Sequence, residues 1–153
     1  MKKTTITKSE KLQAVYSEKN IKDDEVLYLT IRRVFFDRIL NGTKKVEFRD
    51  LTDHYAHKVA NFKANEFIDN KPLRYILLQA GYSENSPRLL VELPTIGYRA
   101  AGEIKVQSRD FNNEDILKIK QNIEIAAENE GFDKKAEFFA FVLGDVIYSE
   151  TFK

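Results

Sequence analysis

Segments that favour β-strands outnumber segments that favour helices along this 153-residue chain. The strand-like segments are short, rich in β-branched and aromatic residues, and separated by turn-forming residues. We expect about six strands, at residues 26–31, 44–49, 73–80, 88–93, 102–109 and 138–148. Only three or four helices accompany them, which gives too few crossovers for a doubly wound parallel sheet. The pattern therefore predicts an α+β protein, mostly β, built as a small mixed β-barrel flanked by helices.

Helical spacing is clearest in two segments. Residues 32–41 carry apolar side chains four positions apart, and Gly42 follows where a helix commonly ends in the left-handed conformation. A later helix begins after Asn112 or Asn113, either of which can cap it, and ends at Gly131. The apolar stripe of this later helix consists of Ile116, Ile119, Ile123 and Ala127. Each helix thus has one apolar face with which to flank the strands.

The chain divides into a polar N-terminal segment and one domain. Residues 1–24 are interpreted as a polar arm, either disordered or forming a short surface helix. Its apolar residues at helical spacing are Leu12, Val15 and Tyr16. Residues 25–153 contain no linker, repeat or Gly/Ser tract, and a domain of this size builds a core without disulfides. Within this domain, residues 51–70 show rough helical spacing, and Gly144 suggests a bulge in the last strand.

Composition excludes several kinds of protein. Cysteine is absent, which excludes disulfides, thiolate catalysis and a cysteine-based zinc site. No run of about 18 apolar residues occurs, so we expect no membrane span. The basic residues at the start are followed by no apolar stretch of the kind that directs export, so we expect a cytoplasmic protein.

Net charge is +1, but the charges are distributed unevenly. Residues 1–63 contain 14 basic and nine acidic residues, whereas residues 111–153 contain five basic and nine acidic residues. A basic front third suits contact with an anion or with nucleic acid. The alternative is a solvated surface, with much of the positive excess in the polar N-terminal segment.

The most informative stretch is residues 41–50, where a helix end, a glycine turn and a charged strand follow one another. Strand alternation gives this stretch one polar face and one apolar face. The polar face consists of Lys45, Glu47 and Arg49, and the apolar face consists of Val46 and Phe48. We expect the apolar pair to be buried and Lys45 to be exposed. Lys44 joins the polar face only if the turn at Gly42 carries it around.

These charged groups suit a binding site for an anion or a polar heterocycle. The Arg49 guanidinium offers a bidentate fork for phosphate or carboxylate, and a lysine offers a point charge. The candidate ligand-binding residues are Gly42, Lys44, Lys45, Glu47 and Arg49. The alternative is an exposed strand face whose charges form cross-strand ion pairs.

The Gly-x-Lys-x-x-Glu-x-Arg pattern at residues 42–49 resembles the hallmark motif of the ASCH family, relatives of PUA domains. The surrounding order of strand, helix, turn and motif strand is also similar, as are residues 102–106 and 141–147. The resemblance covers residues 26–149. It implies a PUA-like β-barrel with a cleft lined by the motif residues, and RNA or nucleotide ligands.

One branch of this family consists of amidohydrolases that remove the acetyl group from N4-acetylcytidine. Their motif uses a Lys, a Thr three residues later, and a Glu farther along the chain. Lys44 matches the Lys, and Glu47 stands at the Thr position. Candidates for the distant acid are Glu124, Glu128 and Glu130. An enzyme of this kind would use Lys44 and Glu47, with Glu47 activating a water. Because cations flank Glu47 and favour an ion pair, binding is the preferred interpretation.

Other residues give weaker signals. His54 and His57 lie three apart near Asp53 and could share a helix face that suits a metal, but surface histidines are the simpler interpretation. The tyrosines that could stack on a base are Tyr75, Tyr82 and Tyr98. The arginines that could extend a basic rim, or form surface salt bridges, are Arg74, Arg88 and Arg99. No glycine-rich dinucleotide motif or Walker motif occurs, and we expect no metal and no cofactor.

The sequence thus predicts a module that binds RNA, a nucleoside or a nucleotide. In this interpretation Gly42 makes the turn, and Lys44 and Arg49 hold the anionic or carbonyl part of the ligand. Glu47 accepts hydrogen bonds from a base amino group or orients Lys44. The alternatives are an amidohydrolase acting on an N4-acylated cytidine or related nucleoside, and a protein-interaction module without a ligand. No membrane partner is expected, and the sequence carries no signal for an oligomeric state.

Overall fold

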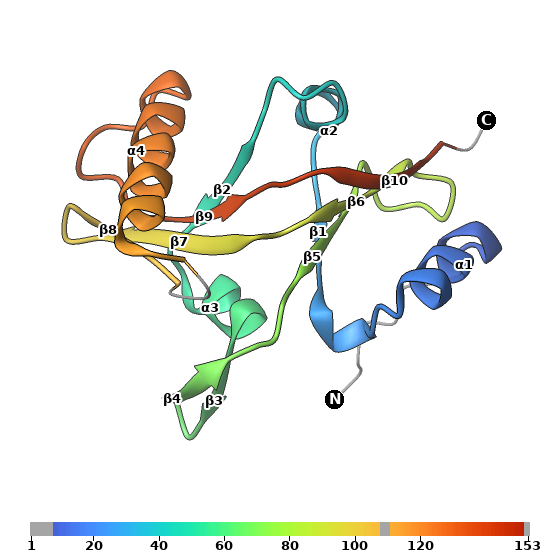
Figure 1. The fold of residues 1–153 in the computed structure, drawn as a ribbon, viewed down its shortest axis with the longest axis horizontal. Helices are drawn as coiled ribbons and strands as arrows, with labels where there is room; N and C mark the ends of the chain where they lie inside the picture. The colour runs from blue at the N-terminus through green and yellow to red at the C-terminus, as the bar shows by residue number, and fades with distance from the viewer. Residues whose placement is uncertain (1–7, 108–110, 152–153) are drawn as a thin grey trace.

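A computed structural model describes residues 8–107 and 111–151 of the chain, and this part contains ten strands and four α-helices (Figure 1). The helices are α1 (Glu10–Lys19), α2 (Arg33–Leu40), α3 (Asp53–Val59) and α4 (Asn113–Asn129), with a short 3-10 turn at Asp23–Glu25. The strands are β1 (Val26–Thr30), β2 (Val46–Asp50), β3 (Ala60–Lys63), β4 (Glu66–Asn70), β5 (Tyr75–Gln79), β6 (Arg88–Glu92), β7 (Thr95–Ala100), β8 (Glu103–Val106), β9 (Phe138–Val142) and β10 (Val146–Glu150).

The strands form two four-stranded sheets and a separate hairpin. The first sheet has the order β1-β5-β6-β10, with β1 parallel to β5 and the other pairs antiparallel. The second sheet has the order β2-β9-β7-β8 and is antiparallel throughout. Strands β3 and β4 pair only with each other. The predicted mixture of helices and strands is confirmed, but the protein is not mostly β, because strands and helices take nearly equal shares of the described residues.

The expected closed barrel is absent from the described part of the chain, where both sheets are open. The chain changes sheet from β1 to β2, from β2 to β5 through the β3–β4 hairpin, and then by two short passages, the first between β6 and β7 and the second between β9 and β10. The segment predicted as one strand over residues 138–148 is therefore two strands in different sheets. Gly144 lies at the second passage instead of in a bulge, and a Cβ there would approach the Cβ of Glu92 to 3.0 Å. Close approach of neighbouring chain segments thus explains the glycine.

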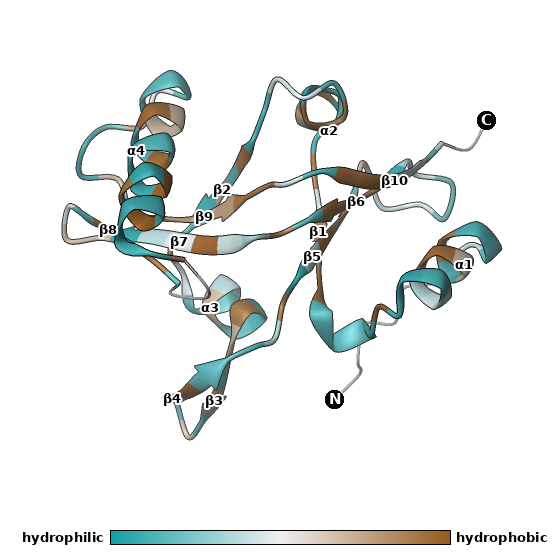
Figure 2. Ribbon diagram, in the orientation of Figure 1, coloured by the Kyte–Doolittle hydropathy of each residue, from teal (hydrophilic) through white to brown (hydrophobic). Residues whose placement is uncertain are grey.

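The main core lies between the two sheets. Its buried side chains come from β1, β5 and β6 on one side and from β7 and β9 on the other, with Phe36 and Ile39 of α2 closing one end. Helix α4 packs on the opposite face of the second sheet through Ile123 and Ala127. Helices α1 and α4 carry polar and apolar residues together, as helices with one buried face do (Figure 2). The inner strands are buried on both faces, which explains their nearly continuous apolar sequences.

The N-terminal segment is not a loose arm over residues 10–19, because these residues form helix α1. The Ser9 side chain caps this helix by accepting a hydrogen bond from the Leu12 amide at 3.1 Å. Leu12 is fully buried and Tyr16 nearly so, and both pack against Leu77 and Leu90 of the first sheet. Residues 10–19 thus form a short helix whose contacts join it to the first sheet, and residues 1–7 lie outside the described residues.

The two helices with the clearest spacing are confirmed. Helix α2 ends just before Gly42, whose φ of +84° is the left-handed conformation. Helix α4 is capped by the Asn112 side chain, and Gly131 follows it with a φ of +86°. None of the helices in the described residues has the length and apolarity that crossing a membrane requires.

Residues 51–70 differ from the helical prediction after the first turns. Helix α3 ends at Val59, and the remainder is the β3–β4 hairpin. The hairpin turn is Ala64-Asn65, both with positive φ, the geometry of a tight two-residue turn. Strand β7 also escaped prediction because Gly97 and Arg99 interrupt its apolar pattern. The end of the strand predicted over 102–109 lies outside the described residues beyond Gln107.

Candidate functional site

The turn after α2 places the start of the motif. The amides of Thr43 and Lys44 both donate to the Arg38 carbonyl, at 2.9 and 3.0 Å, and reverse the chain beyond Gly42. Strand β2 then pairs antiparallel with β9, and the Lys45 carbonyl accepts a hydrogen bond from the Leu143 amide at 2.9 Å. The turn thereby brings Lys44 to the same side of β2 as Glu47.

One face of strand β2 is turned toward α4 and the other toward a cleft, and Phe48 borders the cleft as well. Val46 is buried, Phe48 is half-buried against Phe132 and Phe138, and Lys45 is exposed. Glu47 is buried as well, although it belongs to the polar face. The polar face is therefore covered by neighbouring elements instead of being open to solvent.

Lys44 lies at the centre of this polar cluster. Its side chain is 3% exposed, and its Nζ lies 2.5 Å from Glu130 Oε1 and 3.5 Å from Glu47 Oε1. The ammonium also lies 5.2 Å from the centre of the Phe35 ring and 5.8 Å from that of Phe48. Two carboxylates and two aromatic faces thus compensate a nearly buried positive charge.

Arg49 closes the cluster on the other side of Glu47. Its Nε and NH2 atoms donate to Glu47 Oε2 at 3.1 and 2.8 Å. The guanidinium also donates to the Thr30 carbonyl at 2.7 Å and to the Tyr55 hydroxyl at 3.2 Å. Burial lowers the Arg49 pKa, but the Tyr55 hydrogen bond and the Glu47 carboxylate outweigh burial and raise the pKa above its ordinary value.

Among the three glutamates considered as a distant acid, Glu130 is the one that meets the motif. Glu124 instead lies 3.4 Å from the guanidinium of Arg99, and Glu128 is exposed on α4. Lys44 and Arg49 together with Glu47 and Glu130 form a cluster of two cations and two anions. The formal charge of this four-residue cluster is zero.

A cleft of about 780 Å³ lies beside the cluster. It opens where the parallel strands β1 and β5 end, and the start of α2 and the loop after α4 complete its sides. The polar groups inside the cleft are Glu47, Arg49 and Glu130. Its aromatic walls are Phe35, Phe48, Tyr55 and Phe132. The residues at its mouth include Arg32, Arg33 and Tyr82. Lys44 lies behind the two carboxylates, and Gly42 and Lys45 lie outside the lining.

Of the three arginines considered for a basic rim or for surface salt bridges, two form ion pairs but lie inside the protein. Arg88 is buried and donates to the Gln79 side-chain oxygen at 2.9 Å, with Glu150 3.5 Å away. Arg99 is buried and donates to the carbonyls of residues 133 and 136, so it holds the loop that carries Phe132. Both guanidinium groups can be buried because carbonyl, amide or carboxylate oxygens satisfy their hydrogen-bond donors. Arg74 is exposed.

The remaining candidates lie apart from the cleft, with one exception. His54 and His57 are exposed on α3, and the described residues contain no group of three metal-ligating side chains. Tyr75 is half-buried, and Tyr98 borders a groove beside the β3–β4 hairpin. Tyr82 is 91% exposed and lies at the cleft mouth.

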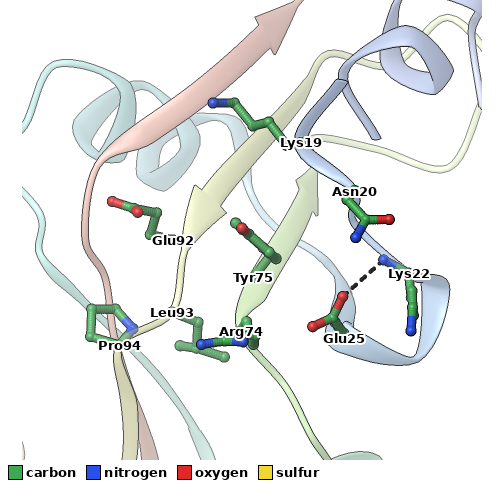
Figure 3. A pocket seen from close by; sticks show the side chains of 9 residues that line it. All are labelled: Lys19, Asn20, Lys22, Glu25, Arg74, Tyr75, Glu92, Leu93 and Pro94. Carbon is green, nitrogen blue, oxygen red and sulfur yellow. Dashed lines mark hydrogen bonds between the residues drawn. The ribbon is translucent and has the colours of Figure 1, made fainter. Parts of the chain in front are cut away.

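A second hollow, of about 570 Å³, lies between α1 and the first sheet (Figure 3). The charged ends of Lys19, Arg74 and Glu92 are spread around it and do not converge. The Glu92 carboxylate accepts a hydrogen bond from the Asp145 amide at 3.2 Å, so it already serves the passage between the sheets. The cleft beside β2 is therefore the better candidate site.

Sequence reasoning missed the contributions of Arg32, Arg33, Tyr55 and Phe132 to the cleft. Phe132 follows Gly131 directly, and an aromatic residue after a helix end is a weak signal on its own. Arg32 and Arg33 stand directly after the first strand, where a strand end meets a helix start, and this position could have indicated a site.

Comparison of the chain with protein-family models, with curated proteins and with solved structures gives no match. The fold and the site therefore define a class only. It is a mixed α+β protein with two packed sheets and an aromatic cleft beside a neutral cluster of four charged residues, of which Lys44 and Glu47 are buried.

Proposed function

We propose that this protein is a PUA-like module of the ASCH type that binds RNA or a nucleotide in the cleft beside β2, in the cytoplasm. The carrying observation is that Glu47, Arg49 and Glu130 face a cleft with four aromatic walls. A volume of about 780 Å³ suits a nucleoside-sized ligand, and such sites combine apolar walls with a few polar groups. The Gly-x-Lys-x-x-Glu-x-Arg motif supplies two of the three polar groups.

The polar groups have distinct roles in this proposal. The carboxylates of Glu47 and Glu130 accept hydrogen bonds from amino groups of a base, and the flat aromatic walls hold its ring. Lys44 already contacts both carboxylates, so it positions them instead of holding an anion. Gly42 contributes the turn, and Lys45 faces solvent.

The test is a thermal-shift screen of the four nucleosides, their monophosphates and short RNAs. A ligand at about 100 times its Kd stabilises the folded state by about 2.7 kcal/mol and raises Tm. Glu47→Gln should abolish the shift, because it replaces an acceptor oxygen with an amide. Glu124→Gln is the matched control, because Glu124 pairs with Arg99 outside the cleft lining. A wild-type Tm that no compound moves would contradict the proposal.

A second candidate function has one specific observation in its favour. Glu130 lies on Lys44 and lines the cleft together with Glu47, so a lysine and two acids are grouped as an amidohydrolase requires. In that reaction water adds to the acetyl carbonyl of N4-acetylcytidine and a carboxylate takes its proton. The C–N bond then breaks as the protonated carboxylate returns the proton to N4, so the amine leaves as cytidine and the acetyl group as acetic acid, which ionises to acetate.

Two observations place hydrolysis second. Glu47 already accepts two hydrogen bonds from Arg49, and Lys44 separates it from Glu130. Release of cytidine from N4-acetylcytidine by the wild type, lost in both Glu47→Gln and Glu130→Gln, would reverse the order of the two functions. If the protein neither binds these compounds nor hydrolyses them, a protein-interaction module becomes the favoured function.

A further inference from the structure

The charges of the cleft are arranged by depth. The interior carries two carboxylates, and the cations beside them, Lys44 and Arg49, are already paired with them. A phosphate group placed there would meet like charges and would need a cation that is not free. The interior therefore suits the uncharged end of a ligand, and an anionic end is favoured only at the mouth.

Arg32 supplies a positive charge at the mouth. It is exposed, its guanidinium lies 5.7 Å from the centre of the Phe35 ring, and no described carboxylate lies within ion-pair distance. The neighbouring Arg33 differs, because its Nε already donates to Asp37 at 3.0 Å. Of the two arginines, Arg32 is thus the better contact for a phosphate.

Tyr82 supplies an open aromatic ring at the same mouth, and it is 91% exposed. The loop that carries Tyr82 is held in place by Gln79. The Gln79 side chain donates to the Gly81 carbonyl at 2.8 Å and accepts a hydrogen bond from Arg88 at 2.9 Å. The Ser83 amide also donates to the Ser86 hydroxyl at 3.1 Å. A free ring on a fixed loop is a suitable stacking surface for a base.

We propose that the ligand is single-stranded RNA and that the site reads it as a strand instead of as a free nucleoside. One base enters the cleft, Arg32 contacts the phosphate beside it, and Tyr82 stacks on the neighbouring base. This inference rests on the proposed function and adds to it the two residues that distinguish a strand from a nucleoside.

The test compares the four nucleosides with a mixed-sequence heptaribonucleotide by calorimetry or fluorescence anisotropy. The heptamer should bind at least about tenfold more tightly than the best nucleoside at low salt. Arg32→Ala should weaken heptamer binding several-fold, flatten the plot of log affinity against log salt by about 0.7, and leave nucleoside binding unchanged. Tyr82→Ala should weaken heptamer binding at least about fivefold, and Tyr82→Phe should restore it.

Arg38→Ala is the matched control, because Arg38 is exposed on α2, the helix that Arg32 directly precedes, and does not line the cleft. Equal losses in Arg32→Ala and Arg38→Ala would overturn the inference, since binding would then follow general charge. Nucleosides that bind as tightly as the heptamer would overturn the inference and leave the proposed function intact. Failure of every probe to bind the wild type would refute both.

Discussion

Replacing Lys44 with methionine should show how much the charged cluster contributes to stability. Methionine keeps an unbranched apolar side chain at this position and removes the ammonium, which lies over the rings of Phe35 and Phe48. Breaking a buried ion pair from one side costs about 3–5 kcal/mol, because it leaves an uncompensated charge. Here Glu47 keeps Arg49, and the Glu130 side chain is 21% exposed, so we expect about 3 kcal/mol.

Urea denaturation measures this loss directly. With a slope of about 2 kcal/mol per molar urea, Lys44→Met should lower the midpoint by about 1.5 M. Lys45→Met is the control, because the adjacent lysine is exposed, and it should change stability by less than about 0.5 kcal/mol. Adding Glu130→Gln to Lys44→Met should recover about 1 kcal/mol, because it removes the carboxylate left without its partner.

Two results would refute this reasoning. Equal stabilities of Lys44→Met and Lys45→Met would mean that the cluster is energetically unimportant. A further loss in the double variant would mean that Glu130 is stabilised by something other than Lys44.

Two more predictions concern the parts of the fold that surround the site. Burial raises the pKa of Tyr16 to about 12, above the unfolded value of about 10, so rising pH favours the unfolded state between these values. In urea denaturation from about pH 9 to pH 12, the ionisation of Tyr16 should lower the free energy of unfolding by about 2–3 kcal/mol. Tyr16→Phe should remove this contribution to the pH dependence, and Tyr82→Phe should leave it unchanged. Gly97→Ala should cost about 1–3 kcal/mol, because its Cβ would lie 2.8 Å from Ile123 Cδ1. Adding Ile123→Val, which lacks that methyl group, should recover part of the loss, and no recovery would show that the backbone is the obstacle.

The elements that were predicted correctly are those whose signals are local. Helix α2 has its apolar residues four apart and a glycine directly after its end, and α4 has an asparagine cap and a glycine at its far end. Strand β1 is a short run of β-forming residues. Each of these signals lies within about one or two turns of the element it defines.

The elements that were missed depend on pairing between distant segments. The run at 138–148 reads as one apolar strand, and only the positions of its partners divide it between β2 and β7 on one side and β6 on the other. The hairpin of β3 and β4 has apolar spacing that also fits a helix, and its turn at Ala64-Asn65 decides the outcome. The difference between a barrel and two open sheets is likewise a matter of which strand edges meet.

The sequence by itself determined the motif strand, the face on which its charged side chains lie, and the turn that precedes it. Glu47 and Arg49 are two positions apart on one strand, so strand geometry alone places them on one face. The glycine turn before them follows from the end of α2. The glycine, the alternation of charged and apolar residues, and the spacing of the motif all lie within residues 41–50, so local sequence is enough to predict them.

Only the tertiary structure decided what this face meets. Glu130 reaches Lys44 across 86 residues of chain, and the Thr30 carbonyl reaches Arg49 across 19. Glu130 and Glu47 together balance the charges of Lys44 and Arg49, so the charged stretch that suggested an anion site is an internally paired cluster. An arginine with no ion pair among the described residues, Arg32, lies instead at the cleft mouth, because the chain passes there from the end of β1 to the start of α2. Long-range packing sets such distances, and no local pattern in the chain encodes them.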